Sequence, residues 1–116
     1  MNSKASKLEA FGRLLEVMDE LREKCPWDQK QTFETLRHLT IEETYELGDA
    51  ILNKDLNEIK KELGDLLLHI VFYAKLGSEE DAFDIAAVSK GLLVSLYKIV
   101  GSWFLIFSNP FWYELR

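Results

Sequence analysis

Apolar residues recur at steps of three and four along most of the chain, which is the spacing of one face of an α-helix. This pattern predicts a first amphipathic helix over about residues 4–24. The helix should end near Cys25, because Pro26 has no amide hydrogen and its ring disfavours helical geometry in the preceding residue. The segment CPWDQKQT is then expected to be a connecting loop. No strand is predicted, so the expected fold class is all-α.

Capping residues indicate where the next helices begin. A short helical segment over residues 33–39 leads to Thr40, which with Glu43 matches the reciprocal cap in which each side chain bonds a free amide. A helix over about residues 41–53 is therefore expected to start at this point.

The same capping logic applies to the second half of the chain. Asp55 can cap a helix over about residues 56–76, and Gly77 can end it in a left-handed conformation. Ser78 can then cap a fourth helix, which carries apolar residues as far as about Tyr97.

Four carboxylates should lie at matching heights in the hairpin of the two central helices. Glu46 and Glu62 each lie eight residues from Lys54, which is placed at the centre of the turn. Glu43 and Asp65 each lie eleven residues from it, so a rise of about 1.5 Å per residue brings both couples level. Within each helix the two acids are three residues apart and share a face. The register therefore makes convergence of the four side chains possible.

The surroundings of Asp65 make such a cluster costly. In the segment LGDLLLHIVFYA, residues 63–74, it is the only side chain with a full charge at neutral pH. Two like charges about 4 Å apart repel by roughly 4 kcal/mol at an effective dielectric near 20. Lys60 and Lys61 are expected at the wrong angle on the same helix to neutralise the aspartate. A bound cation fits the residue types best, and oxygen ligands suit hard ions such as Mg²⁺.

Ordinary structural roles remain open for several of these residues. In the structural alternative, Glu43 serves only as a cap partner and Glu46 lies on a solvated face. His69, one turn after Asp65, could be a ligand, but a single histidine among apolar neighbours is more often a hydrogen-bonded core residue. A carboxylate-bridged di-iron bundle normally needs two Glu-x-x-His motifs, and only His69 is nearby.

Composition and charge narrow the setting. The 116 residues, 47% of them apolar, are enough for one domain of ordinary size. The net charge of −6 argues against a general nucleic-acid binder. Cys25 is the only cysteine, so no intramolecular disulfide can form, and the first residues carry no apolar run typical of a secretion signal. A cytoplasmic location is the default expectation.

Three segments carry a resemblance to a known family: CPWDQKQTFETL, TIEETYEL and ELGDLLLHIVFYA. They resemble the MazG-type nucleoside triphosphate pyrophosphohydrolases of the all-α NTP pyrophosphatase superfamily, whose EExxE and ExxD motifs match residues 42–46 and 62–65. The resemblance spans about residues 8–90. It implies a four-helix-type bundle whose central antiparallel hairpin carries the acidic cluster, completed by association into a homodimer or homotetramer. It also implies cleavage of nucleoside triphosphates into monophosphate and pyrophosphate, a housecleaning of the nucleotide pool.

The resemblance also implies roles for individual residues. Glu42 and Glu43 would be catalytic, Glu42 as an outer-shell residue or a base that orients water. Trp27 could stack on a base or merely anchor the core, and Lys30 could meet a phosphate oxygen. Four carboxylates would hold Mg²⁺, for which Mn²⁺ could substitute: Glu43, Glu46, Glu62 and Asp65.

The C-terminal part departs from the family pattern. In the family the fourth helix ordinarily continues into a basic stretch of the form KLxxRHPHxF that helps to grip the triphosphate. Residues 91–116 contain no such stretch, and Lys98 and Arg116 are their only cations. We therefore divide the chain into a MazG-like helical domain, 1–97, and an atypical aromatic-rich tail, 98–116.

The altered tail leaves other interpretations open. One is a non-catalytic or impaired regulatory or oligomerisation module that keeps the metal-binding cluster. A membrane anchor over residues 92–107 would be sixteen residues long, short of the roughly 20 needed to span a bilayer; no membrane partner is expected. The tail aromatics are instead expected to pack on the bundle or on a partner subunit: Trp103, Phe104, Phe107, Phe111 and Trp112.

Overall fold

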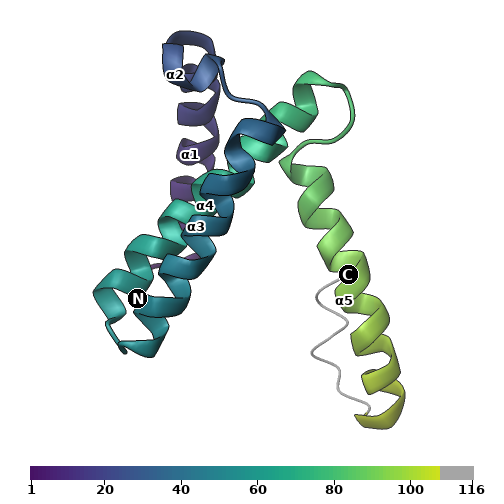
Figure 1. Ribbon diagram of the computed structural model, residues 1–116. Coiled ribbons are helices and arrows are strands. Elements are labelled where there is room, and N and C mark those ends of the chain that lie inside the picture. The colour runs from purple at the N-terminus through teal and green to yellow at the C-terminus, as the bar shows by residue number, and fades with distance from the viewer. Residues whose placement is uncertain (108–116) are drawn as a thin grey trace.

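The computed structural model describes residues 1–107, with only the backbone described for residues 101–107. Within this range the chain forms five helices and no strand, as the sequence predicted for the fold class. The helices are drawn in Figure 1: α1 Lys4–Lys24, α2 Pro26–Gln29, α3 Phe33–Leu52, α4 Leu56–Glu79 and α5 Ile85–Phe107.

The antiparallel hairpin of α3 and α4 is the centre of the structure, and these two helices share more contacts than any other pair in the described part of the chain (Figure 1). Lys54 takes a left-handed backbone conformation in the turn, with φ of 54°. Asp55 caps α4 as predicted, because its carboxylate accepts hydrogen bonds from the amides of Asn57 and Glu58 at 3.1 and 3.2 Å. The hairpin therefore has the register that the sequence implied.

The predicted helix boundary at Thr40 is wrong, because α3 is continuous from Phe33 to Leu52. The reciprocal cap lies eight residues earlier, where the side chains of Thr32 and Thr35 each accept a hydrogen bond from the other's amide. Within α3 the Thr40 hydroxyl donates to the Leu36 carbonyl at 3.1 Å, the bond that a threonine in mid-helix commonly makes. A Thr-x-x-Glu pattern in mid-helix is thus no cap.

The segment after α1 is not a loop throughout. Residues 26–29 form the short helix α2, which Pro26 can begin because the first helical position needs no amide hydrogen. Arg22 anchors this segment, since its Nη1 donates to the carbonyl oxygens of Asp28 at 2.7 Å and Gln31 at 3.2 Å. The same guanidinium pairs through Nε with Glu79, at the end of α4, at 2.9 Å.

The predicted turn between α4 and α5 is also shifted. α4 runs past Gly77 to Glu79, and the left-handed residue is Asp81. The Ser78 hydroxyl donates to the Lys75 carbonyl at 2.6 Å instead of capping α5. Asp84 does so, because its carboxylate accepts from the Ala87 amide at 2.8 Å.

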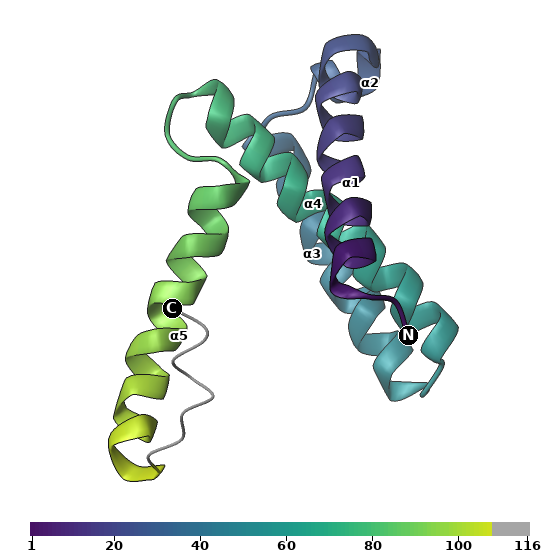
Figure 2. The ribbon, with the colours of Figure 1, turned by 180° about the vertical axis from the view of Figure 1, so that it is seen from behind.

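The core lies where α1 crosses the upper half of the hairpin, as Figure 2 shows from behind. Met18 of α1 packs there with Leu36 of α3 and with a group from α4. That group is Val71, Phe72 and Leu76. Burial of these side chains stabilises the fold at the end of the hairpin away from its turn.

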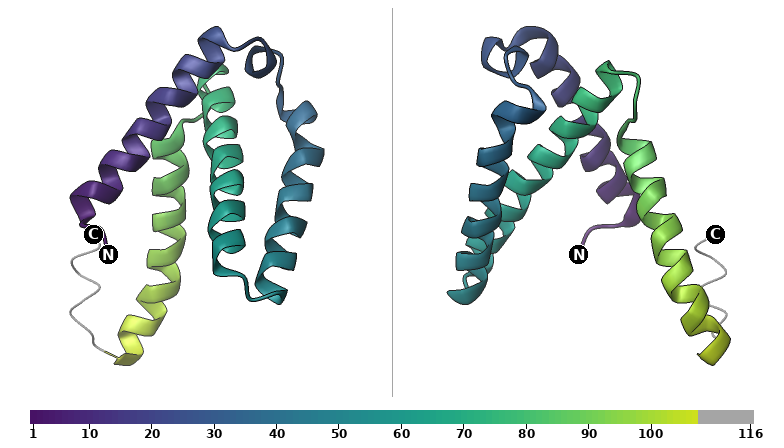
Figure 3. Two further views of the ribbon diagram at one scale, coloured as in Figure 1. Left: turned by 90° about the vertical axis from the view of Figure 1, so that its left-hand side faces the viewer. Right: turned by 45° about the vertical axis from the view of Figure 1, so that its right-hand side comes forward.

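Helix α5 leaves the rest of the molecule soon after it begins, and the right view of Figure 3 shows it diverging from the hairpin. The radius of gyration is 17.2 Å, whereas a compact domain of this length would have about 13 Å. The helix continues through position 97 to Phe107 and exposes apolar side chains, among them Leu92 with 61% of its surface accessible. The chain by itself therefore leaves an apolar helix largely uncovered.

The prediction that the tail aromatics pack on the bundle or on a partner concerns side chains that lie outside the described residues. Among the helices of the described part, none combines the length and apolarity needed to cross a membrane.

Gly77 is the one described glycine whose added Cβ would collide with a neighbour, the ring of Phe83. We expect Gly77→Ala to lower the free energy of unfolding by about 1–3 kcal/mol, because the ring must move. Gly12→Ala is the matched control: a Cβ there meets nothing within 4 Å, so it should stabilise α1 by roughly 0.5–1 kcal/mol. Denaturant unfolding followed by circular dichroism measures both. Equal effects of the two substitutions would contradict the role given to the Phe83 contact.

Candidate metal centre

Three of the predicted carboxylates meet between α3 and α4. Glu43 of α3 and Glu62 and Asp65 of α4 each offer one oxygen, and these oxygens all lie within 4.8 Å of one another. The hairpin register explains this arrangement, because each couple counted from Lys54 lies level across the two helices.

Two oxygens of this cluster are buried without any hydrogen-bond donor in the described structure, Oε2 of Glu43 and Oε2 of Glu62. Only 5% of the Glu62 surface is accessible. A buried carboxylate oxygen without a partner is costly, and most such atoms in proteins have one. Oxygen-only ligands at this spacing suit a hard divalent cation of the Mg²⁺ type, so the residues present fit a metal centre.

Lys61 is a partner that the sequence analysis wrongly excluded. Its Nζ lies 3.1 Å from Oε1 of Glu62 and 3.6 Å from Oδ2 of Asp65. The prediction that Lys61 lies at the wrong angle to neutralise Asp65 is wrong, because the flexible stem of a lysine reaches the neighbour four residues along the helix. The ammonium group of Lys61 thus offsets part of the charge of the three carboxylates.

The pKa values show that the cluster is electrostatically crowded. Burial of Glu43, together with the negative charges of Asp65 and Glu46, raises its pKa above the ordinary 4.5. The hydrogen bond from Lys61 holds the pKa of Glu62 below its ordinary value. The pKa values of the two carboxyls are therefore shifted in opposite directions, and Glu62 is the more readily ionised of the two.

Glu46 lies beside Glu62 but outside the tight group of three. Its side chain is exposed, and the hydrogen bond to Glu62 raises its pKa. Together with residues of the hairpin end it lines an open acidic groove, which also includes Asp49, Asp55, Glu58 and Glu62. Glu46 thus faces solvent beside the cluster.

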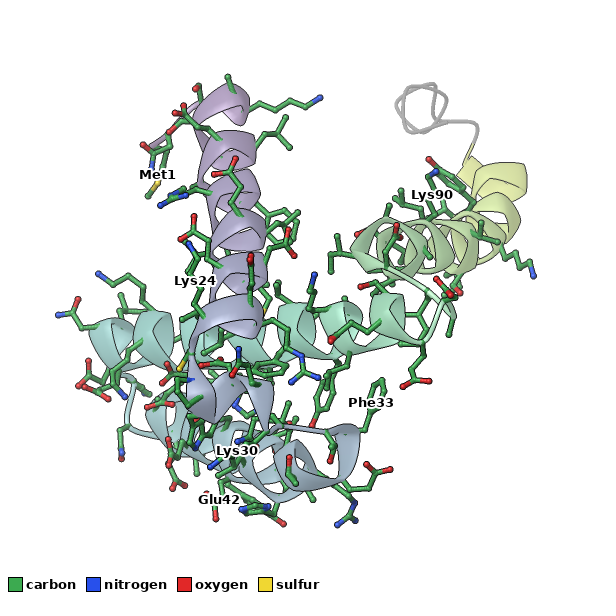
Figure 4. All side chains as sticks on the ribbon, turned by 90° about the horizontal axis from the view of Figure 1, so that it is seen from above. Met1, Lys24, Lys30, Phe33, Glu42 and Lys90 are labelled. Carbon is green, nitrogen blue, oxygen red and sulfur yellow. The ribbon has the colours of Figure 1, made fainter. Side chains whose placement is uncertain are left out.

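The other predicted site residues are not in the cluster. Glu42 is exposed on α3, as the side-chain view shows (Figure 4). Trp27 lies in α2 with 55% of its surface accessible, so it does not anchor the core. Lys30 follows α2, which lies at the end of the hairpin opposite the turn (Figure 1). In the described structure neither side chain forms a hydrogen bond or an ion pair with the carboxylates.

A polar group that joins α3 and α4 above the cluster was only partly foreseen. His69 is hydrogen-bonded, as the structural interpretation of this residue expected, and its partner is Thr40. Tyr73 bonds the same hydroxyl. The sequence pattern that indicates this group is the four-residue spacing of His69 and Tyr73, at the height of Thr40 in the hairpin.

The match to known families decides the assignment of the hairpin. Residues 31–96, more than half of the chain, match the family model described as the MazG nucleotide pyrophosphohydrolase domain. The chain belongs to the MazG family. Both acidic motifs lie within the matched MazG domain.

Relatives of this MazG domain include named enzymes. The chain is 51% identical over 75 residues to the nucleoside triphosphate pyrophosphohydrolase of Escherichia coli K12, covering 62% of this chain and 28% of that protein. It is 46% identical over 84 residues to the nucleoside triphosphate pyrophosphohydrolase/pyrophosphatase MazG of Thermotoga maritima, covering 71% and 33%. The chain thus spans about a third or less of the length of these curated relatives.

A solved structure shares the fold. The crystal structure of a MazG-related protein from Thermotoga maritima superposes with a TM-score of 0.67 at 27% identity, covering 74% of this chain and 75% of that chain. About three quarters of this chain therefore shares its helical arrangement with an experimentally observed MazG-related protein.

Neutralising Glu43 should stabilise the metal-free MazG domain. Because its pKa is raised in the fold, the ionised form is disfavoured, and this cost appears as pH rises through the ordinary 4.5 and the higher folded value. In EDTA, Glu43→Gln should raise the melting temperature by several degrees at pH 7, with the smallest gain near pH 3, where the native carboxyl is protonated in both states. Saturating Mg²⁺ should stabilise the unaltered chain but hardly the variant.

Glu9→Gln on the exposed face of α1 is the control for this experiment. It removes the same charge without touching the cluster. A Glu43→Gln variant that is less stable than the unaltered chain in EDTA at pH 7 would contradict the electrostatic cost assigned to the cluster.

Proposed function

We propose that this MazG domain hydrolyses nucleoside triphosphates to nucleoside monophosphate and pyrophosphate with the help of a divalent cation. The observation that carries the proposal is the pair of buried, unpartnered oxygens of Glu43 and Glu62 in a hairpin that matches the family. The activity by which these relatives are named supports the reaction class.

The proposed cation site consists of Glu43, Glu62 and Asp65, joined by Glu46 from the open side. Mg²⁺ is the expected ion and Mn²⁺ an alternative, because both accept carboxylate oxygens and water. When bound, such an ion supplies charge neutralisation at the phosphates and a more acidic water. A triphosphate carries several negative charges, so it would not approach three carboxylates without this neutralisation.

The chain's own residues have separate tasks in this proposal. Glu42 lies next to Glu43 on α3 and is exposed, so it can accept the proton of the attacking water. The water adds to the α phosphorus, the bond from that phosphorus to the oxygen bridging the α and β phosphates breaks, and its electron pair leaves with pyrophosphate. Trp27 presents an exposed indole for stacking on the base, and Lys30 offers an ammonium for a phosphate oxygen.

A second copy of the chain is the proposed cover for α5. The exposed apolar side chains on this helix include Val88, Leu92, Leu93, Val94 and Leu96. Contiguous apolar surface of this kind marks an association site in proteins that stay in solution. A homodimer or homotetramer would complete the bundle that one chain leaves open. A cytoplasmic location and the absence of a nucleic-acid partner remain predictions from composition.

Activity is tested by measuring pyrophosphate and monophosphate release from a panel of nucleoside triphosphates with and without Mg²⁺. We expect metal-dependent release that falls at least about 100-fold in Glu43→Gln and in Asp65→Asn, since even outer partners of metal ligands cost 10–100-fold. Glu9→Gln should keep full activity. Release of inorganic phosphate instead would contradict cleavage between the α and β phosphates.

No release, with cation binding retained, would favour the non-catalytic module that keeps the cluster. That outcome would assign importance to the basic stretch that residues 91–116 lack.

Association is tested by light scattering coupled to size-exclusion chromatography. We expect a dimer or tetramer, and we expect Leu92→Gln to shift it toward monomer because it removes apolar surface from the contact. Lys90→Gln, an exposed polar position on the same helix, should leave the assembly intact. A monomer for the unaltered chain at micromolar concentration would contradict the proposed partner.

A further inference from the structure

The side chain of Thr40 connects the two helices of the hairpin one turn away from the carboxylates. Its Oγ1 lies 2.7 Å from Nδ1 of His69 and 2.5 Å from the hydroxyl of Tyr73, both on α4. It lies 3.1 Å from the carbonyl oxygen of Leu36 on its own helix. Three partners surround a single hydroxyl group.

The valence of a hydroxyl group allows one consistent arrangement that satisfies all three partners. A threonine hydroxyl has one hydrogen to donate and two lone pairs to accept with. A carbonyl oxygen can only accept, so the hydrogen goes to Leu36. Nδ1 of His69 and the hydroxyl of Tyr73 must then both donate to Thr40. This places the imidazole proton on Nδ1 and leaves Nε2 unprotonated in the neutral ring.

The surroundings of His69 agree with a neutral ring. Burial lowers the pKa of His69, against the smaller opposing effect of the Asp65 charge. The ring of Phe33 stacks on the ring of Tyr73 at a centroid distance of 5.8 Å and an interplanar angle of 4° (Figure 4). This contact limits rotation of the tyrosine, whose hydroxyl therefore has a defined direction toward α3.

The position of this group relative to the acidic cluster gives it a consequence. Thr40 precedes Glu43 by three residues, and His69 follows Asp65 by four, so each pair shares a helix face. On the other side of the cluster the hairpin turn joins the same two helices. The carboxylates thus lie between two points at which α3 and α4 are held together.

The crowded carboxylates push the two helices apart. Like charges about 4 Å apart repel by roughly 4 kcal/mol at an effective dielectric near 20, and Lys61 offsets only part of this. The turn resists this repulsion on one side of the cluster, and on the other side the core contacts between Leu36 and α4 begin one turn beyond Thr40. A hydrogen bond across α3 and α4 beyond the cluster opposes their separation.

We propose that Thr40 is a positioning residue for the metal centre, whose bonds to His69 and Tyr73 hold the carboxylates at ligand spacing before a cation arrives. The inference rests on the proposed metal site and deepens it. Preorganisation of this kind raises affinity, because the cation need not pull the helices together. Loss of partners around metal ligands typically costs 10–100-fold in metal affinity.

The first test measures the affinity for Mn²⁺ alone by isothermal titration calorimetry. We expect Thr40→Val, which keeps the shape and removes the hydroxyl, to weaken Mn²⁺ binding at least about tenfold. Thr40→Ser should restore the affinity. Thr44→Val is the matched control, because the Thr44 hydroxyl donates only within α3, to the Ile41 carbonyl at 2.7 Å. Circular dichroism confirms that each variant is folded.

A second pair of variants keeps the proposal testable if Thr40→Val does not fold. The amide nitrogen of an asparagine can take the place of Nδ1 as a donor, so His69→Asn should keep most of the Mn²⁺ affinity. His69→Leu, which has no donor, should lose at least about tenfold. Equal affinities of these two folded variants would overturn the positioning role.

Nitrogen-15 spectra of the imidazole rings give a readout that a merely structural role would not predict. The chain has two histidines, so His38→Gln assigns the signals of His69. We expect a protonated Nδ1 and an unprotonated Nε2 at neutral pH in the unaltered chain, and loss of this preference in Thr40→Val. A proton on Nε2 in the unaltered chain would overturn the arrangement.

The outcomes separate the two proposals. Mn²⁺ affinity of a folded Thr40→Val variant equal to that of the unaltered chain overturns the role of Thr40 alone and leaves the metal site standing. Absence of Mn²⁺ binding by the unaltered chain overturns the metal site and the positioning role together.

Discussion

Repulsion among the carboxylates between α3 and α4 is the constraint on which the rest of this structure depends. Glu43, Glu62 and Asp65 bring their oxygens within 4.8 Å of one another, and two of these oxygens are buried without a donor. Such an arrangement is unfavourable in the absence of a cation, so other parts of the fold must supply the stability that the cluster removes. The expected gain is tight binding of a divalent ion at a place where the helices are already aligned.

The stabilising contacts are concentrated away from the cluster. Met18, Leu36 and Val71 are almost completely buried where α1 crosses the hairpin. Arg22 joins α1, the α2 segment and the end of α4 through its guanidinium. The hairpin thus has a packed end and a charged end, and the bonds of Thr40 lie between them. This division allows the domain to stay folded despite the repulsion among its clustered carboxylates.

The open side of the molecule has a physical explanation of the same kind. One hairpin with one crossing helix buries only part of the apolar surface in a chain of this length. Helix α5 carries further apolar residues but diverges from the hairpin, so its surface is available to another molecule. In the proposed assembly, a second copy covers the apolar surface that α5 leaves exposed.

The sequence by itself determined the helical class, the first helix, the capped turn at Asp55 and the matching heights of Glu43 and Asp65, because each depends on local spacing and on the constant rise of a helix. Tertiary structure decided the rest. The hydroxyl of Thr40 has partners across the hairpin, on α4, which no local cap signal contains. The divergence of α5 likewise depends on packing between segments that are far apart in the sequence. These features depend on three-dimensional proximity, and the linear pattern records only neighbours along the chain.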